Sequence, residues 1–176
     1  MTQIAIPTNN LSISWAEQPA LAAQIAEFFC AHADVAYISH AELQGGRALT
    51  PQKWHPDLWK KIHAQALQTL QHPATDGSAD AIACAWMDDQ LVGIAFVSFS
   101  TGDLHNRFAV LDDMIVSPAM RGKGVGLQFM DWVAASAKTN GMQRIFLESG
   151  IANNGAHHFF ERTGFKQTSV VMMRDL

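Results

Sequence analysis

The chain has 176 residues, of which 48% are hydrophobic and 16% are charged, and its formal net charge is -4. This composition is typical of a globular protein that buries a sizeable core, and it excludes a disordered chain. With 12 basic residues against 16 acidic ones, the chain lacks the overall basic character of a nucleic-acid-binding protein. No apolar run approaches the roughly 18 residues that span a bilayer. We therefore expect neither nucleic acid nor a membrane as a partner.

The N-terminal stretch MTQIAIPTNN lacks the basic region and the long apolar region of a secretory signal. The two cysteines, Cys30 and Cys84, lie in apolar runs and lack the CxxC spacing of a metal or redox site. Free cysteines in such runs behave as small buried hydrophobic residues. We expect two buried free thiols, no metal site and a cytoplasmic location.

The first half of the chain predicts one strand and two helices. The alternating stretch LSISW favours a strand at 11–15. Pro19 fits the first turn of a helix with apolar residues at helical spacing. The segment 34–51, which contains a Gly-Gly loop signal, is expected to be irregular. A second helix is expected at about 56–72, and 72–80 reads as a loop.

The second half predicts a hairpin followed by a strand–helix–strand unit. Asp88-Asp89 separates two alternating apolar runs and predicts a tight hairpin turn. A strand–helix–strand connection places a parallel pair in the sheet. We therefore expect a mixed α/β fold, with a mostly antiparallel sheet flanked by helices, in a single domain over 1–176. The expected elements are strands at 81–87, 91–100, 107–116, 143–149 and 165–176, and helices after the glycine loop to about 139 and at 153–162.

The stretch RGKGVG, Arg121–Gly126, lies between a predicted strand and a predicted helix. Its glycines allow a tight turn that points backbone N–H groups outward, and the N-terminus of the following helix adds positive charge. The loop lacks the GxxxxGK[ST] pattern of a Walker A motif and the third glycine of a Rossmann fingerprint. On this loop alone, a pyrophosphate cradle and a plain strand–helix turn both remain open.

A second motif follows, N-x-x-A-x-x-FF-x-x-x-GF, which starts at Asn153 and ends at Phe165. Together with V-x-P-x-x-RGKGVG it resembles the GNAT superfamily of acyl-CoA-dependent N-acetyltransferases. The resemblance covers roughly 91–176, and the pair of motifs is much more specific than either motif alone. The first half of the chain shows only a compatible order of elements.

The resemblance implies acetyl-CoA as co-substrate. The backbone amides of the loop would hold the pyrophosphate, and the backbone of the preceding strand would bond the pantetheine arm. That strand is expected to carry a bulge and to splay from the strand at 143–149, with the acyl-pantetheine in the gap. The implied cofactor-binding residues are Met114, Ile115, Val116, Arg121, Gly122, Lys123, Gly124, Val125, Gly126, Asn153, Ala156 and Phe160.

The sequence departs from the family at Phe160, where family members often carry a tyrosine that is proposed to protonate the leaving thiolate. Phenylalanine has no hydroxyl, and the chain has a single tyrosine, Tyr37. Water, Ser149 and His157 are the alternatives for this role. A coenzyme A thiolate is a tolerable leaving group, because the pKa of a thiol lies near 8.5.

The candidate catalytic bases are Asp112 and Asp113, in the stretch LDDMIV. A carboxylate can collect the proton that the attacking amine loses. Adjacent residues of a regular strand point to opposite faces, so we expect one of the two to line the cleft unless a bulge changes this. Resemblance to the spermine/spermidine-type branch of the family makes Asp112 the first choice and Asp113 the second, with Glu148 third. Local anchoring of one or both aspartates is the alternative.

In this family the acceptor site is built by the first two helices and their connection. The aromatic, histidine and acidic residues of this region are Tyr37, His40, Glu42, Trp54, His55 and Trp59. Ring faces and carboxylates suit a cationic amine. We expect an N-acetyltransferase that acts on a primary amine of a small molecule by direct attack in a ternary complex. A non-catalytic acyl-CoA-binding module and a protein N-terminal or lysine acetyltransferase remain alternatives, and the family implies a homodimer.

Overall fold

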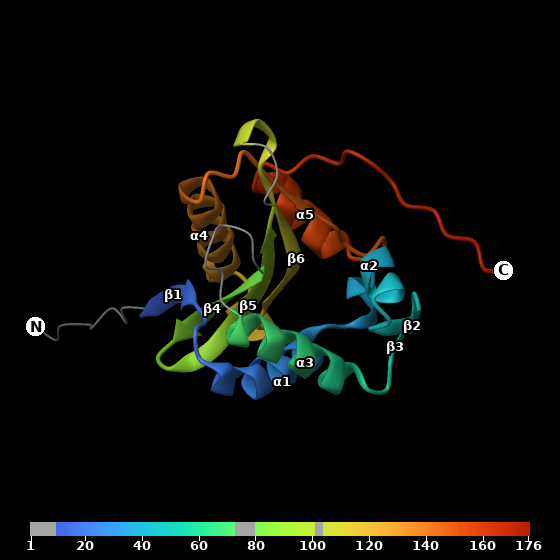
Figure 1. Cartoon of the computed structure of the whole chain (residues 1–176), viewed down its shortest axis with the longest axis horizontal. Helices are drawn as coiled ribbons and strands as arrows, with labels where there is room; N and C mark the ends of the chain where they lie inside the picture. The colour runs from blue at the N-terminus through green and yellow to red at the C-terminus, as the bar shows by residue number, and fades with distance from the viewer. Residues whose placement is uncertain (1–9, 73–79, 101–103) are drawn as a thin grey trace, which may run out of the picture.

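The computed structural model describes residues 10–72, 80–100 and 104–176 (Figure 1). Its centre is a five-stranded sheet in the order β1-β4-β5-β6-β7. Neighbouring strands are antiparallel except for β6 and β7, which run parallel. The prediction of a mixed, mostly antiparallel sheet with one parallel pair is therefore confirmed. The strands are β1 (Leu11–Trp15), β4 (Asp80–Met87), β5 (Gln90–Phe99), β6 (Phe108–Val116) and β7 (Arg144–Leu147).

Helices cover both faces of the sheet. Helices α1 (Ala22–His32) and α3 (Leu58–Gln71) pack on one face. Helices α4 (Val125–Thr139) and α5 (Asn154–Arg162) contribute to the core on the other face. Successive side chains of a strand point to opposite faces, so alternate residues of β4 and β5 enter the two cores. Burial on both faces explains why these strands read as nearly continuous apolar runs.

The segment expected to be irregular, 34–51, contains regular structure. It holds the short helix α2 (His40–Gln44) and the strand β2 (Ala48–Thr50), which pairs with β3 (Lys53–Trp54). Helix α2 begins with a capping box, in which the side chain of Glu42 accepts from the backbone N–H of Ser39. The sequence carried this signal, because Ser followed three residues later by Glu is the capping-box pattern.

The predicted hairpin turn is present between β4 and β5. Asp88 and Asp89 have φ angles of 48° and 63°, which lie in the left-handed region that tight hairpin turns require. Most of the loop expected at 72–80 lies outside the described residues. The strand expected at 143–149 is shorter, since β7 ends at Leu147.

The prediction of a closing strand at 165–176 is wrong. This segment adopts no helix or strand, and it leads away from the sheet (Figure 1). The apolar side chains of Val170 and Met172 are 71% and 92% exposed. A strand exists only where a neighbouring backbone accepts its hydrogen bonds, and β-favouring residues alone do not supply that neighbour. No helix in the described part of the chain is long and apolar enough to cross a membrane.

The two cysteines differ in their surroundings. Cys84 in β4 is buried and Cys30 in α1 is exposed, and both are free thiols. The expectation of burial is confirmed for Cys84 and wrong for Cys30, because an apolar run on a helix still has an outward side. Burial raises the pKa of Cys84 to about 12, so this thiol is unreactive at neutral pH.

Candidate functional site

Strand β6 carries a bulge at Asp112. Phe96 of β5 pairs with Asp113, whereas the next residue of β5, Val97, pairs with Leu111. Asp112 is therefore the extra residue of the bulge. The side chains of both aspartates turn to the face of the sheet that carries α1 and α3, because Asp113 pairs with Phe96 of that core and Asp112 contacts Ser98. The expectation that adjacent residues point to opposite faces fails here because of the bulge.

Strands β6 and β7 separate immediately after this point. Their last paired residues are Leu111 and Leu147, and the rest of β6 pairs only with β5. The N–H of Ser117 donates to Val92 of β5, so by alternation the N–H groups of Val116 and Met114 face the gap. The splayed pair that the sequence predicted is present, and its gap opens a cleft.

The cleft has a volume of about 710 Å³ and extends from the acceptor region to the glycine loop. Of the twelve implied cofactor-binding residues and the two candidate aspartates, four do not line it. Asp113, Ile115 and Val125 are buried in the protein interior, and Lys123 is exposed outside the cleft. The predicted residues that do line it are Asp112, Met114, Val116, Arg121, Gly122, Gly124, Gly126, Asn153, Ala156 and Phe160.

The glycine loop forms the N-terminus of α4. Gly124 is the N-cap, with a φ of 75°, and no side chain caps the first turn. The first N–H groups of a helix have no partner within the helix, so those of α4 are available to an anion. Gly122 also has a left-handed φ, of 74°, which glycine adopts without strain. Arg121 adds a positive charge beside these amides on the cleft wall. These groups fit a pyrophosphate.

Helix α5 supplies the opposite wall of the cleft. Asn153 caps this helix, because its side-chain Oδ1 accepts from the N–H of Ala156 at 3.3 Å. Phe160 packs its ring against Phe159 and Phe165, with centroids 5.2 and 5.5 Å apart. The predicted cofactor residue Asn153 thus has a structural role as well as a place on the cleft, and Phe160 presents an apolar surface.

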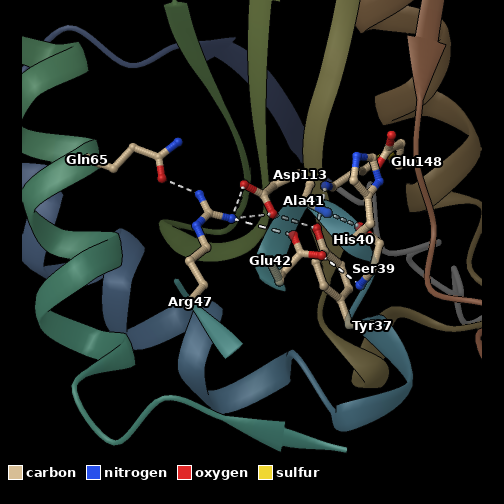
Figure 2. Close-up of polar contacts among 10 residues, drawn as sticks. Tyr37, Ser39, His40, Ala41, Glu42, Arg47, Gln65, Asp113 and Glu148 are labelled. Carbon is tan, nitrogen blue, oxygen red and sulfur yellow. Dashed lines mark hydrogen bonds and ion pairs between the residues drawn. The ribbon is translucent and has the colours of Figure 1, made fainter. Parts of the chain in front are cut away.

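A buried ion pair lies beneath the bulge (Figure 2). Nη1 of Arg47 donates to both carboxylate oxygens of Asp113, at 3.0 and 2.9 Å. The hydroxyl of Tyr37 donates to Asp113 at 2.8 Å and accepts from the N–H of Met114 at 3.2 Å. Arg47 also donates to Gln65 of α3. Three separate segments of the chain therefore meet at the Asp113 carboxylate, and α3 joins them through the contact of Gln65 with Arg47.

The pKa values of this group follow from burial and charge. Burial raises the pKa of Asp113 to about 6, against the lowering effect of Arg47 and the Tyr37 hydroxyl. Burial also raises the pKa of Tyr37, and Asp113 adds to this effect, so the phenol keeps its proton. Burial disfavours the Arg47 cation, but the charge and hydrogen bond of Asp113, together with Tyr37 and Glu42, outweigh this and raise the pKa of Arg47. Hydrogen bonds to both Asp113 oxygens and the lack of a cleft surface suit an anchoring role.

Of the carboxylates that line the cleft, Asp112 and Glu148 lie on either side of the gap between β6 and β7. Asp112 accepts from the hydroxyl of Ser98, and burial raises the pKa of Asp112, with a further rise from the Asp80 charge. Glu148, the first residue after β7, contacts Nδ1 of His40 through one oxygen at 2.5 Å. A carboxylate with a raised pKa beside a cleft is suited to accept a proton.

The residues expected at the acceptor end divide into two groups. Tyr37 and Glu42 line the cleft. Trp54 packs against the core of α1 and α3, and Trp59 stacks on His63 with centroids 4.8 Å apart. Arg47 and Gln65 belong to the hydrogen-bond network around Asp113, but they were not predicted from the sequence. Neither residue is part of a motif in its own stretch of sequence.

The fold and the cleft define a class of proteins with a splayed parallel strand pair beside a helix N-terminus. Residues 49–165, more than half of the chain, match the acetyltransferase (GNAT) family. The chain therefore belongs to the acetyltransferase (GNAT) family.

Several known proteins resemble the chain. It is 32% identical over 51% of its length to a streptothricin acetyltransferase of Streptomyces lavendulae, of which the match covers 46%. It is 32% identical over 36% of its length to an aminoalkylphosphonate N-acetyltransferase of Salmonella typhimurium, of which the match covers 41%. The matches thus span less than half of these curated relatives. An aminoglycoside N-acetyltransferase solved in complex with CoA shares the fold, with a TM-score of 0.66, 16% identity and coverage of 97% and 98% of the two chains.

Proposed function

We propose that this protein is an N-acetyltransferase that transfers the acetyl group of acetyl-CoA to a primary amine of a small cationic molecule. The observation that carries the proposal is the distribution of charge along the cleft. One end has the uncapped N-terminus of α4 with Arg121, and the other end has the carboxylates Asp112 and Glu148. The cleft therefore suits an anionic donor at one end and a cationic acceptor at the other.

The donor would lie along the gap between the splayed strands. Loop amides around Gly122 and Gly124 would hold its pyrophosphate, and the gap-facing backbone of Met114 and Val116 would bond its pantetheine arm. The N–H of Met114 already donates to the Tyr37 hydroxyl, so an acyl oxygen at this position would share or replace that bond. Family membership supports acetyl-CoA as the co-substrate.

The reaction would be a direct transfer. Asp112 takes a proton from the bound ammonium, and the freed nitrogen lone pair attacks the thioester carbon. The C–N bond forms, the C–S bond breaks, and the sulfur leaves with its electron pair as the thiolate. The nitrogen loses its second proton to solvent, which leaves a neutral amide. No acyl-enzyme is needed, since neither Cys30 nor Cys84 lines the cleft. Asp113 would act as an anchor of the bulge and not as the base.

The acceptor end favours a cationic amine over an amine that also carries an anion. Of the five charged residues that line the cleft, Arg121 and Arg162 are basic and Glu42, Asp112 and Glu148 are acidic, with Glu42 also 3.8 Å from Arg47. A phosphonate beside the three carboxylates would be repelled. The relative named for streptothricin is therefore the better guide to the acceptor than the relative named for aminoalkylphosphonates.

A non-catalytic acyl-CoA-binding module is the second candidate. Phe160 favours it, because its ring packs in an aromatic cluster and has no group to assist the leaving thiolate. The raised pKa of Asp112 beside the cleft favours the enzyme. A cytoplasmic location and a homodimer complete the proposal. Both can be checked, by cell fractionation and by light scattering on the purified chain.

A thermal-shift and thiol-release screen tests the function. Acetyl-CoA is expected to raise the melting temperature, because a ligand that binds only the folded state stabilises it. Cationic amines are then expected to release free coenzyme A, and matched aminoalkylphosphonates are expected to release much less. Stabilisation without thiol release from any amine would favour the binding module. The absence of any stabilisation would remove the coenzyme from the proposal.

A further inference from the structure

We infer that Ser149 is a further catalytic residue, whose hydroxyl hydrogen-bonds the acyl-thioester end of the donor; this inference rests on the proposed function. Within the described residues, three buried side-chain atoms lack a hydrogen-bond partner: Trp54 Nε1, Arg107 Nε and Ser149 Oγ. Of these three residues, Ser149 is the one that lines the cleft. Ser149 thus lies on the cleft wall, and its hydroxyl has no hydrogen-bond partner among the described residues.

An unpaired hydroxyl in a protein interior opposes folding, because it has lost its bonds to water and gained none. Such groups are rare in native proteins, and each one requires an explanation. A bound molecule that completes the hydrogen bond is the explanation that fits a residue on a cleft wall. Acetyl-CoA would then supply a hydrogen-bond partner that no described residue of the protein supplies.

The position of Ser149 agrees with a contact to the reacting end of the donor. Leu147 is the last residue of β7 that pairs with β6, opposite Leu111. Ser149 follows two residues later, so it stands across the gap from the part of β6 that contains Met114. In the proposed function, the acyl-pantetheine occupies this gap. The hydroxyl and the Met114 amide would therefore approach the thioester from opposite sides.

The backbone that carries Ser149 is firmly held. A Cβ on the next residue, Gly150, would lie 2.2 Å from the carbonyl oxygen of Ala36 and 2.6 Å from that of Ile38. On the other side, Glu148 contacts His40. The segment 36–40 thus packs directly on the end of β7. A hydrogen-bond donor that is held in place before the reaction needs no reorganisation during it. This property makes preorganised donors effective in stabilising charge that develops in a transition state.

The hydroxyl would donate a hydrogen bond and keep its proton. As the C–S bond breaks, the sulfur takes the electron pair and becomes a thiolate, which accepts the Ser149 hydrogen bond. The bound ammonium gives one proton to Asp112, the nitrogen takes the acetyl group and then loses its second proton to solvent as the amide forms, so atoms and charges balance. Serine would in this way supply part of the assistance that Phe160, lacking a hydroxyl, does not give.

The test compares Ser149→Ala with wild type, and uses Ser136→Ala, on the distant helix α4, as the matched control. In Ser149→Ala the free protein is expected to melt at the same temperature or higher, because an unpaired hydroxyl has been removed. The stabilisation by acetyl-CoA is expected to shrink, and kcat is expected to fall about tenfold. A nucleotide fragment of coenzyme A without the pantetheine arm should stabilise both proteins equally. Ser136→Ala should match wild type in all four measurements.

A purely structural role for Ser149 predicts a different pattern. Free Ser149→Ala would melt at a lower temperature than wild type, and its stabilisation by the nucleotide fragment and by acetyl-CoA would change to the same extent. That pattern, or an unchanged kcat in a folded Ser149→Ala protein, would overturn the inference. Ser149→Cys keeps a similar volume with a weaker donor, and it should retain an intermediate kcat even if the alanine variant folds poorly. If wild type itself neither binds acetyl-CoA nor releases thiol, the proposed function fails, independently of Ser149.

Discussion

The two ends of the cleft are built in opposite ways. The donor end is one continuous stretch, Arg121–Gly126, whose glycines leave the first amides of α4 uncapped. The acceptor end rests on a network of Tyr37, Arg47, Gln65 and Asp113, which lie far apart in the sequence and are joined by hydrogen bonds. The first is ready for a ligand because its polar groups are unpaired. The second is a rigid support because its polar groups are paired.

This difference predicts different responses to mutation. Changes beneath the acceptor end should act mainly on folding, because they expose unsatisfied buried groups. Changes on the cleft surface should act mainly on binding or turnover, because the groups there are available to ligands. The following variants test whether the two ends respond differently, and they are given from the largest expected effect to the smallest.

Arg47→Met should destabilise the protein by about 3–5 kcal/mol, because it leaves the Asp113 carboxylate buried without its cation. The loss should be larger near pH 8 than near pH 5. Without Arg47 the folded-state pKa of Asp113 rises further above its unfolded value, so the protonated form supports the fold at low pH and this support disappears as pH rises. Urea unfolding at the two pH values measures both effects.

The double variant Arg47→Met, Asp113→Leu is the control for that prediction. Replacing both partners of a buried ion pair with apolar side chains is often nearly neutral. It should therefore recover most of the lost stability. An equal loss in the single and double variants would show that Arg47 acts through packing and not through the Asp113 charge.

Asp112→Asn should lower kcat by about a hundredfold, the low end of the effect of removing a general base. Asparagine keeps the shape and the Ser98 contact, so the affinity for acetyl-CoA should stay near wild type. Because the base must be ionised, the wild-type rate should fall as pH falls through the pKa of Asp112, which is raised by burial. The variant should lose this acidic limb in a pH–rate profile. Asp113→Asn with a larger loss of kcat in a folded protein would move the role to Asp113.

Gly150→Ala should cost about 1–3 kcal/mol, because its Cβ would overlap the backbone of the segment 36–38. Since that segment carries Tyr37, the KM for the amine should also rise while the affinity for acetyl-CoA changes little. Thermal unfolding and steady-state kinetics measure the two effects. Gly155→Ala is the matched change in α5, where a Cβ meets nothing within 4 Å, and it should not destabilise the fold.

Gly124→Ala should cost about 1 kcal/mol of stability, because alanine is strained at the left-handed φ of 75°. The relaxed loop would misdirect the amides of α4, so the affinity for acetyl-CoA should fall as well. Calorimetric titration with acetyl-CoA measures this. A folded variant with wild-type affinity would mean that the loop amides do not hold the donor.

The same contrast explains which features could be predicted from the sequence. The turn at Asp88-Asp89, the glycine loop and the α5 motif are local, so their residue types alone predict their conformations. Resemblance to the family implied a bulge in this strand. Which residue is the extra one, Asp112, depends on the pairing register with β5 and could not be read from the sequence. The ion pair of Arg47 and Asp113 joins residues 66 apart in the chain, and Arg47 has no distinctive local pattern.

The strand wrongly predicted at 165–176 shows that a favourable local sequence does not by itself produce a strand. Val170 and its neighbours have high β propensity, yet the segment 165–176 pairs with no strand in the described part of the chain. Propensity describes what a residue tolerates, whereas a strand needs a partner. Helix α2 was missed for the opposite reason, since its capping box is only four residues long and lies in a stretch otherwise rich in loop signals.

The central claim is that one cleft holds the donor at the loop end and the amine at the acidic end at the same time. The most direct test is the affinity of a conjugate in which coenzyme A is linked through its sulfur to a cationic amine. If both ends are engaged together, the conjugate should bind about a hundredfold more tightly than coenzyme A alone. A conjugate that binds no more tightly than coenzyme A would contradict the claim, because the amine would then gain nothing from the acidic end of the cleft.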